Sequence, residues 1–524
     1  MSTSDFSVCI LTAGLGSRMG PYSSIINKGL LPYKNKALIS HIIDQFGNDK
    51  HFVIAVGYNA EQIIDYINIA HPDLDVIFVK VPNYDSPHAG PAQSLYRCKE
   101  HLDQRFYFVS CDTLFHGFDI NKNTDKNWIG IAPRPSDQSY KYCNVKIENE
   151  KVTEIIDKEF CDDTFQSFIG LMHIKDYDVF FDNMSKTIEY KTEISQGFHN
   201  NLNLYAYALT WQDFGTYDLY RYEVLKETAF DFSKTNEFFY TVNNRIIKFH
   251  KDREVSYDKY VRTLFNSSVF PEDFSYKGNF HYYTKLPGTT LYENITPEIF
   301  SKLLNWLQNK VWFKVIESDF SEKCYDFYYK KTVARLEQFY AKYPSFCDFE
   351  MVNQSSVLPL QTCLKLIDWK NISNGLPAFT HGDLQFDNIL YNKEFVLLDW
   401  RQKFSDSYFG DLYYDLAKMY GGMILNYNAI KHGCLEHQYQ DQHLDVNLKD
   451  LHQESEIFNV FYQFIERNEY DLSKVELLVP IIYANMSPLH EPPFDKILYG
   501  LSQYYFTQWF NKYSCDESTA SIKK

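Results

Sequence analysis

Three oxygen-bearing side chains lie close together in the stretch HGDLQFDNILYNKEFVLLDW. Asp383 and Asn388 are separated by four residues, and Asp399 follows eleven residues later at the end of an apolar run. A loop that supplies an Asp and an Asn, followed by a hairpin that returns a second Asp, is the layout of kinase-type phosphoryl transfer. In that chemistry Asp383 would orient an acceptor hydroxyl and take its proton, and Asn388 and Asp399 would hold Mg²⁺ on a triphosphate.

A different phosphate motif stands near the start of the chain, in LTAGLGSRMGPYSSIINKGLLPY. An apolar strand there runs into Gly14 and Gly16, which let the backbone approach a phosphate closely and point N–H groups at it. Arg18 adds a permanently charged fork for phosphate oxygens, and Lys28 follows ten residues later. A Gly-x-Gly after a strand is also typical of an ordinary tight turn, and the dinucleotide fingerprint lacks its third Gly.

The elements around these two motifs differ in kind. From residue 6 to about 220, apolar strands alternate with amphipathic helices, which predicts β-α-β units and a mostly parallel sheet covered on both faces. From about 226 onward, EFFYTVNNRIIKFH predicts an antiparallel hairpin with its turn at Asn243 and Asn244, and long helical stretches follow. We therefore predict domains at 1–225 and 226–512, with a flexible tail at 513–524.

Composition excludes several classes of protein. The chain has 524 residues, 45% of them hydrophobic and 17% aromatic, which predicts more than one packed core. The net charge of −16 argues against a nucleic-acid partner, and no apolar run is long enough to span a bilayer. Because its start lacks the features of a signal peptide and its ten cysteines are scattered singly, we expect a cytoplasmic protein without membrane insertion. Its oligomeric state is not predicted.

The first half resembles the nucleotidyltransferases that join a nucleoside triphosphate to a sugar 1-phosphate or to phosphocholine. The resemblance covers roughly residues 5–225 and rests on the glycine loop with its Lys, followed by FVSCDTLF, VTEIIDKEF, FIGLMHI and LTWQDFGTYDLY in the family's order. Asn27 replaces the Pro that often precedes the Lys, as phosphocholine-type members tolerate. A Rossmann-like α/β domain with a mostly parallel mixed sheet is the fold that this resemblance implies.

The resemblance also implies residue roles. Lys28 and Arg18 would be catalytic, Lys158 would contact the acceptor phosphate, and Asp112 and Asp213 would bind Mg²⁺. The implied nucleotide-binding residues of this half are Ala13, Gly14, Gly16, Ser17, Gly90 and Ser94. Because the attacking phosphate is already an anion, this reaction needs alignment and charge neutralisation rather than a protein nucleophile.

The second half, about residues 232–512, resembles the aminoglycoside phosphotransferase and choline kinase superfamily, which shares the protein-kinase fold. The resemblance rests on HGDL, NIL, LLDW and GDLYYDLAKM, and it implies a two-lobed α+β domain. Lys248 stands where the family's strand Lys grips the nucleotide phosphates. No Gly-rich loop precedes Lys248, and its acidic partner is open, with Glu254 the nearest candidate.

Together the two resemblances predict a bifunctional enzyme. One half would use ATP to phosphorylate a small polar alcohol, for which a sugar is the favoured candidate. The other would transfer a nucleotidyl group from CTP or UTP to the resulting phosphate, giving an activated precursor for surface glycan or capsule synthesis. The alternatives are an enzyme that makes CDP-choline from choline, an active nucleotidyltransferase with a non-catalytic kinase-like domain, and a nucleotide sensor built from two inactive domains.

Overall fold

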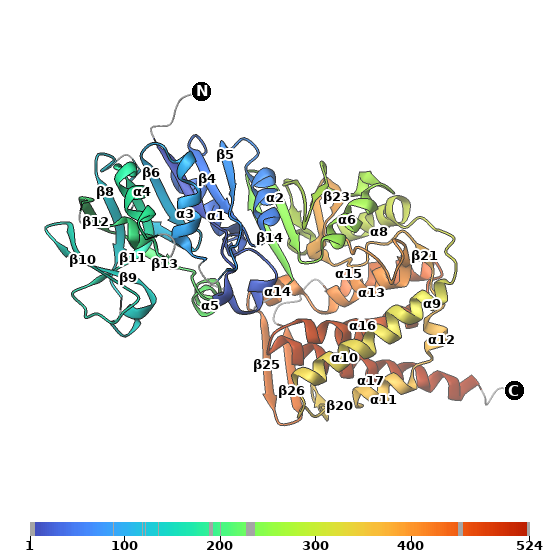
Figure 1. Cartoon of the computed structure of the whole chain (residues 1–524). Coiled ribbons are helices and arrows are strands. Elements are labelled where there is room, and N and C mark those ends of the chain that lie inside the picture. Colours follow the sequence, from blue (N-terminus) through green and yellow to red (C-terminus); the bar gives the residue numbers. More distant parts are fainter. Residues whose placement is uncertain are drawn as a thin grey trace. The chain divides into compact units, whose positions relative to one another are not determined.

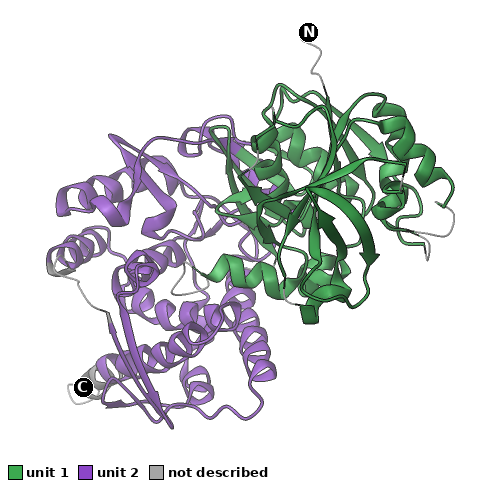
Figure 2. Cartoon of the chain, turned by 90° about the vertical axis from the view of Figure 1, so that its left-hand side faces the viewer, with its two compact units in different colours: residues 1–226, 235–253, 276–282 green, residues 227–234, 254–275, 283–524 purple. Residues whose placement is uncertain are grey.

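The computed structural model describes residues 6–86, 89–117, 119–120, 122–134, 136–187, 192–199, 201–226, 236–448 and 454–520. The chain divides into two compact units, coloured green and purple in Figure 2. The first comprises residues 1–226, 235–253 and 276–282, and the second comprises 227–234, 254–275 and 283–524. Each unit is described by itself.

The first unit is built on a nine-stranded mixed sheet, blue to green in Figure 1. Its strand order is β5 (Val76–Lys80), β4 (His51–Val56), β1 (Ser7–Leu11), β6 (Phe106–Ser110), β11 (Gln166–Ile174), β8 (Asn127–Ala132), β12 (Leu204–Ala208), β10 (Lys151–Asp157) and β9 (Cys143–Glu148). Strands β5, β4, β1 and β6 are parallel, as predicted for the β-α-β part of the chain.

The remaining strands correct the expectation of a mostly parallel sheet. Strand β11 runs antiparallel to both β6 and β8, and β10 runs antiparallel to both β12 and β9. A two-residue turn at Asn149 and Glu150 joins β9 to β10, and so short a connection leads back antiparallel. Helices connect the parallel strands β1, β4, β5 and β6, whereas the described residues between β6 and β11 contain no α-helix.

Helices cover both faces of this sheet. On one face α1 (Leu38–Phe46) and α2 (Ala60–Ala70) pack against Val8 and Ile10, and on the other α3 (Pro91–Arg97) and α4 (Tyr177–Ser185) pack against Cys9. Because successive strand residues point to opposite faces, β1 is buried on both, which explains its continuous apolar run.

The predicted hairpin is confirmed as β14 (Glu237–Val242) and β15 (Arg245–His250), with Asn243 and Asn244 both at positive φ in the turn. It belongs to the first unit, where Tyr240 and Phe249 are fully buried in the same cluster as α1 and α2. The hydroxyl of Tyr240 donates to the carbonyl of Leu30 at 2.7 Å. The domain boundary expected at 225–226 adjoins residues 227–235, which lie outside the described residues, and the proposed domain limits stay a prediction.

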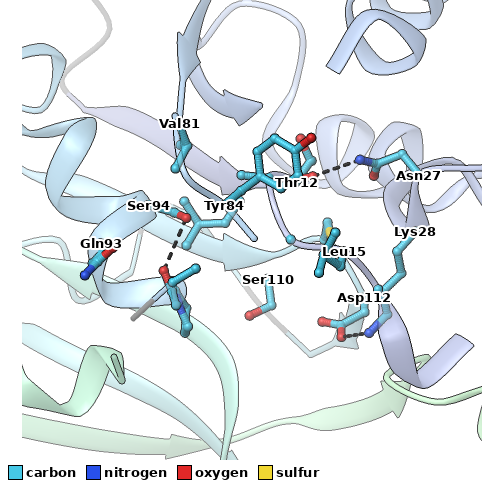
Figure 3. Close-up of a pocket in the computed structure, with 18 of the residues that line it drawn as sticks. Thr12, Leu15, Asn27, Lys28, Val81, Tyr84, Gln93, Ser94, Ser110 and Asp112 are labelled. Carbon is cyan, nitrogen blue, oxygen red and sulfur yellow. Dashed lines mark hydrogen bonds and ion pairs between the residues drawn. The ribbon is translucent and has the colours of Figure 1, made fainter. Parts of the chain in front are cut away.

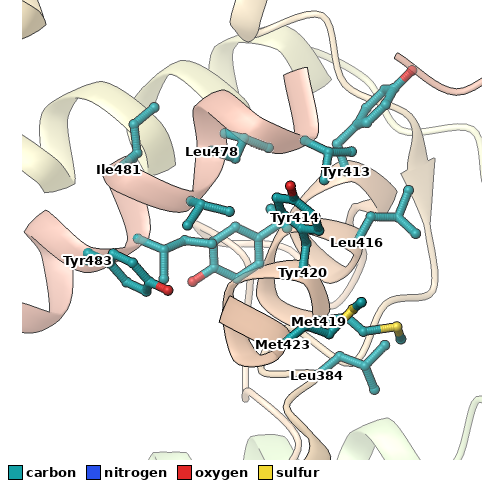
Figure 4. Packing of buried hydrophobic residues seen from close by; sticks show 14 of the residues in the cluster. Leu384, Tyr413, Tyr414, Leu416, Met419, Tyr420, Met423, Leu478, Ile481 and Tyr483 are labelled. Carbon is teal, nitrogen blue, oxygen red and sulfur yellow. The ribbon is translucent and has the colours of Figure 1, made fainter. Parts of the chain in front are cut away.

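The second unit is largely helical. Its main helices are α8 (Pro297–Trp306), α10 (Lys331–Lys342), α13 (Leu412–Ile424), α15 (Glu454–Arg467), α16 (Leu472–Met486) and α17 (Phe494–Ala520). Leu416, Met419 and Tyr420 of α13 belong to the same buried cluster as Leu478, Ile481 and Tyr483 of α16 (Figure 4). A hairpin of β22 (Ile389–Asn392) and β23 (Glu394–Leu397) pairs with β18 (Thr289–Thr290). Helix α17 runs into the predicted tail, of which residues 521–524 lie outside the described part. Among the described residues, no helix combines the length and the apolar character needed to cross a membrane.

Candidate active site

The first candidate site lies where the parallel strands β4, β1 and β6 end. Strand β1 leads directly into the glycine loop, and β6 leads into Asp112. The carboxyl ends of neighbouring parallel strands lie at one edge of a sheet, which is where α/β proteins bind ligands. Gly16 has a φ of 62°, which favours glycine, and a side chain added at Gly14 would enter open space. The loop therefore keeps its backbone accessible to a ligand.

A pocket of about 450 Å³ opens beside this loop (Figure 3). Arg18, Lys28 and Asp112 line this pocket. The lining also includes every nucleotide-binding residue predicted for this half, namely Ala13, Gly14, Gly16, Ser17, Gly90 and Ser94. Gly90 precedes α3, and a side chain there would come within 2.4 Å of Thr192 Cβ. The close packing at Gly90 leaves room for glycine alone.

Lys28 points across the mouth of the loop. Its Nζ forms an ion pair with Asp112 and donates to the carbonyl of Gly215 at 2.9 Å. The position before it is fixed by the Asn27 side chain, whose amide donates to Thr12 O at 2.8 Å and whose carbonyl accepts from Gly29 N at 3.0 Å. Asn27 thus fixes the start of the short helix Lys28–Leu30.

The two predicted metal-binding carboxylates come together. Strand β13 (Thr210–Asp213) pairs antiparallel with β7 (Thr113–His116), so that Asp213 lies opposite Thr113, next to Asp112. A point one bond from Gly215 Cα, where a Cβ would stand, lies 2.7 Å from Asp213 Oδ1 and 3.6 Å from Asp112 Oδ2. Both carboxylates therefore face the same small region.

Their electrostatics differ. Burial alone would raise the pKa of Asp112, but the charges of Lys28 and Arg18 outweigh it and hold that pKa below its usual range. Burial and the neighbouring charge of Asp112 raise the pKa of Asp213. A divalent cation between them would relieve this repulsion, and Mg²⁺ is commonly held by one or two carboxylates together with substrate phosphates. The donor set fits Mg²⁺ in that mode. Within the described residues, no group of three or more His, Cys, Asp or Glu side chains could hold a metal ion.

A second pocket of about 310 Å³ shares Arg18 and Asp112 with the first. It is also lined by Asp213 and by Lys158, the predicted contact of the acceptor phosphate. Lys158 is exposed, has a positive φ of 56°, and forms an ion pair with Glu193. Arg18 and Asp112 thus lie at the junction between a pocket on the glycine-loop side and a pocket on the Lys158 side.

The second candidate site lies in the second unit, around the HGDL loop. Asn388 donates to the carbonyl of Asp383 at 2.9 Å and accepts from Leu398 N at 2.8 Å. Because β22 and β23 form a hairpin, Asp399 returns next to Asn388. The structure therefore brings together the three residues whose spacing opened the sequence analysis: Asp383, Asn388 and Asp399.

Buried hydrogen bonds fix this loop. Asp415 on α13 accepts from the backbone N–H groups of His381 and Gly382, both at 2.7 Å, and from Trp312 Nε1 at 3.0 Å. Gly382 has a φ of 82°, and a side chain there would come within 2.6 Å of Arg401 Cβ. Only glycine suits this position, and Asp415 holds the loop in place through these hydrogen bonds.

Two lysines that the sequence analysis missed pair with the predicted catalytic carboxylates. Lys418 Nζ lies 2.7 Å from Asp383 Oδ1, and Lys259 Nζ of α6 (Arg253–Thr263) lies 3.1 Å from Asp399 Oδ1. Both lysines are buried. Tyr142, whose hydroxyl donates to Asp213 Oδ2 at 2.8 Å, was also missed. Lys418 lies in a helix that is buried from Leu412 to Met423, and its position in phase with these residues is the only sequence signal of its burial.

Lys248 lies on β15 in the first unit, with its Nζ 5.7 Å from the ring centroid of Phe239. The turn before it, where a kinase would carry its Gly-rich loop, is bound to α2 of the same unit. Asn243 donates to Ala70 O at 2.9 Å, and Arg245 donates to Ile69 O at 3.0 Å. The roles of Lys248 and Glu254 stay predictions.

In the first unit, the mixed sheet, the glycine loop and the paired carboxylates form one site at the carboxyl ends of parallel strands. Residues 8–121 match the family model of the MobA-like NTP transferase domain. The match does not extend into the second unit, whose kinase-like assignment stays a prediction.

Several curated proteins are similar to part of the chain. The bifunctional protein GlmU of Methanococcus maripaludis is 23% identical over 163 residues, which cover 31% of this chain and 38% of GlmU. The UTP–glucose-1-phosphate uridylyltransferase AglF of Haloferax volcanii is 26% identical over 110 residues, covering 20% and 43%. The chain thus spans less than half the length of these relatives.

Solved structures are similar over a larger share of the chain. A UDP-glucose pyrophosphorylase in complex with UDP-glucose is 15% identical with a TM-score of 0.37, covering 42% of this chain and 97% of that one. The CTP:phosphocholine cytidylyltransferase of Streptococcus pneumoniae is 19% identical with a TM-score of 0.35, covering 43% and 100%.

Proposed function

We propose that the first unit transfers a nucleotidyl group from a nucleoside triphosphate to a sugar 1-phosphate, releasing pyrophosphate and giving an NDP-sugar. The observation that carries this proposal is the junction of the two pockets. Arg18 and Asp112 line both pockets, and Lys28 pairs with Asp112 there. A triphosphate on the glycine-loop side would then meet a phosphate monoester on the Lys158 side.

The chain's own residues supply alignment and charge. An oxygen of the acceptor phosphate attacks the α-phosphorus, a new P–O bond forms, and the bond to the pyrophosphate oxygen breaks. The loop N–H groups and Arg18 would bind the β- and γ-phosphates, and Lys28 would neutralise charge that develops around the α-phosphate. Lys158 would hold the acceptor phosphate. Asp112 and Asp213 would hold Mg²⁺, which supplies Lewis-acid stabilisation of the phosphate oxygens when bound.

For the second unit we propose phosphorylation of a small polar alcohol, favoured as a sugar, by ATP. Its support is the gathering of Asp383, Asn388 and Asp399 at one loop and hairpin. The alcohol oxygen would attack the γ-phosphorus, ADP would leave, and the hydroxyl proton would pass to Asp383. The product, a phosphate monoester, is the kind of substrate that the first unit consumes. The chain would thus make an activated precursor for surface glycan or capsule synthesis in two steps.

Two alternatives remain. In the first, the alcohol is choline and the product is CDP-choline. In the second, the kinase-like unit binds a ligand without catalysis, an idea supported by the absence of a Gly-rich loop and by the binding of the β14–β15 turn to α2.

The test is to incubate the full chain with Mg²⁺ and ATP, CTP, UTP or GTP against sugars, sugar 1-phosphates, choline and phosphocholine. Pyrophosphate and ADP are measured separately. Pyrophosphate release with a sugar 1-phosphate supports the first proposal, and its absence with every phosphate monoester contradicts it. ADP formation that depends on a free alcohol supports the second proposal, and choline as the preferred alcohol selects the CDP-choline alternative.

A further inference from the structure

Cationic side chains gather around Asp383 in the second unit. Lys418 lies 2.7 Å from Asp383 Oδ1, and Arg401 Nε donates to the carbonyl of the preceding residue, Gly382, at 2.9 Å. The Nζ of Lys331 and the guanidinium carbon of Arg401 lie 3.8 Å and 5.3 Å from the ring centroid of Phe327. Arg335 follows Lys331 by one turn of α10. We call Lys331, Arg335, Arg401 and Lys418 the basic cluster.

The cluster holds more positive than negative charge. Asp383 pairs with Lys418, whereas the other three members have neutral partners. Arg335 donates to Gln338 Oε1 at 3.0 Å, and Arg401 donates to Gly382 O and, at 3.4 Å, to the hydroxyl of Tyr414. Within the part of the chain that the structure describes, Lys331, Arg335 and Arg401 form no ion pair with a carboxylate.

This excess of charge is unfavourable in the protein alone. Burial, followed by repulsion from Arg401, Arg335 and Lys418, lowers the pKa of Lys331 well below its usual range. Burial and Arg401 likewise lower the pKa of Arg335. Like charges held close together in a partly buried place favour the binding of an anion, because the anion restores the charged form of each.

We propose that the basic cluster binds a carboxylate or phosphate group of the acceptor whose hydroxyl faces Asp383, so that the acceptor is an acidic alcohol. A quaternary ammonium group such as that of choline would meet four cations at this place, which argues against the CDP-choline alternative. The identification of the ligand as an acceptor rests on the kinase activity proposed above. The anion site itself does not.

The same cations could serve the γ-phosphate of ATP, and the two sources share one chemistry. A site for the acceptor's anionic group still binds inorganic phosphate when a triphosphate is bound. A site for the γ-phosphate is then occupied by the triphosphate and no longer binds inorganic phosphate. A non-hydrolysable ATP analogue with Mg²⁺ therefore separates them.

The test is isothermal titration calorimetry of the full chain with inorganic phosphate, D-glycerate and choline, at constant ionic strength and with and without the ATP analogue. Lys331→Met and Arg335→Met remove one charge each. Lys330→Met is the matched control, because Lys330 is the next residue along, exposed, and paired with Asp326. Phosphate that binds to the glycine-loop pocket of the first unit contributes equally to all variants.

We expect Lys331→Met and Arg335→Met to weaken one phosphate site at least tenfold, with Lys330→Met unchanged and choline without measurable binding. Circular dichroism checks that each variant is folded. Equal phosphate binding in all variants, or choline binding that exceeds phosphate and glycerate binding, overturns the site. Loss of the Lys331-dependent phosphate site on saturation with the ATP analogue overturns its assignment to the acceptor. If this phosphate site is present and no alcohol yields ADP, the proposed kinase activity fails while the anion site stands.

Discussion

Lys28 and Asp112, 84 residues apart in the sequence, form an ion pair at the junction of the two pockets of the first unit. Only 11% of the Lys28 side chain and 19% of the Asp112 side chain are exposed. A partly buried pair of this kind contributes little to stability after its desolvation cost, and removing one partner leaves the other charge uncompensated. The pair is therefore better explained by the phosphate chemistry of the site than by the stability of the fold.

Asp112→Asn should lower the rate of pyrophosphate release more than about 100-fold, because loss of a metal ligand exceeds the loss usual for residues that only support a ligand. The substitution keeps the size of the side chain and opens no cavity. Asp73→Asn is the control, since Asp73 is exposed on a turn. An undiminished rate in the Asp112→Asn protein would contradict the assignment of Asp112 as a Mg²⁺ ligand.

Tyr142→Phe should raise the Mg²⁺ concentration needed for half-maximal nucleotidyl transfer by about 10–100-fold, with a smaller effect on the rate at saturating Mg²⁺. Tyr142 lines the second pocket, where its hydroxyl donates to Asp213 Oδ2 and orients that carboxylate. Tyr140→Phe, two residues earlier and 56% exposed, should leave the Mg²⁺ dependence unchanged. Identical Mg²⁺ titrations of the two variants would remove Tyr142 from the site.

Tyr240→Phe should lower the free energy of unfolding of the first unit by about 1–3 kcal/mol, because the buried carbonyl of Leu30 loses its donor. Urea unfolding followed by circular dichroism measures this change. Tyr222→Phe removes a hydroxyl from a side chain that is 65% exposed and serves as the control. Equal stability of the two variants would show that the hydrogen bond from Tyr240 to Leu30 does not stabilise the first unit.

His173 should make the first unit less stable in acid. Burial lowers its pKa to about 4, from about 6.5 in an unfolded chain. Between these values the unfolded state binds a proton that the folded state does not, so stability is lost as the pH falls. The loss between pH 8 and pH 5 is about 2 kcal/mol. Its Nδ1 is bonded to Lys126 O at 2.8 Å, and its buried Nε2 has no hydrogen-bond partner among the described residues.

The measurement is urea unfolding of the wild type and of His173→Phe at pH 8 and pH 5. The variant keeps an aromatic ring against Tyr107 and Trp128 and removes the titrating group. It should be less sensitive to pH than the wild type, even if its stability at pH 8 is lower. The same slope in both proteins would contradict this account. His71, also buried with its pKa lowered to about 4, contributes in the same direction and remains in both.

Local patterns were enough to predict the strands and helices of the first 110 residues, the β14–β15 turn and the meeting of Asp383 with Asn388 and Asp399. Each depends on residues close in sequence, such as the pair Asn243–Asn244, whose side chains tolerate positive φ. The antiparallel course of β11 was not predicted, because it depends on which existing strand edge is free when β11 is added. No short-range pattern records that.

The sequence also did not predict that the hairpin packs in the same buried cluster as α1 and α2. Phe238 and Tyr240 alternate as in any half-buried strand, and the pattern does not say which surface covers them. The ion pairs of Lys259 with Asp399 and of Lys418 with Asp383 were not predicted for a similar reason, since each joins residues from distant elements. A chain cut at residue 225 would lack buried Tyr240 and Phe249, so we expect it to be less stable than the sequence analysis implied.

The last prediction concerns the division of labour between the two sites. Asp383→Asn should reduce ADP formation from a free alcohol by about 10²–10⁴-fold, the usual effect of losing a positioned base, and leave nucleotidyl transfer to a pre-formed phosphate monoester nearly unchanged. Asparagine keeps the size of the side chain, so that Lys418 retains an oxygen partner. Lys28→Ala should do the reverse, stopping pyrophosphate release while phosphate monoester accumulates and ATP is consumed. Both reactions are followed in one mixture, with ADP, pyrophosphate and monoester measured separately. The wild type could form a nucleotide-activated product from the monoester but never ADP from any alcohol, acidic alcohols included. That result would contradict the proposed two-step sequence, and the second unit would then be a kinase-like fold used for binding.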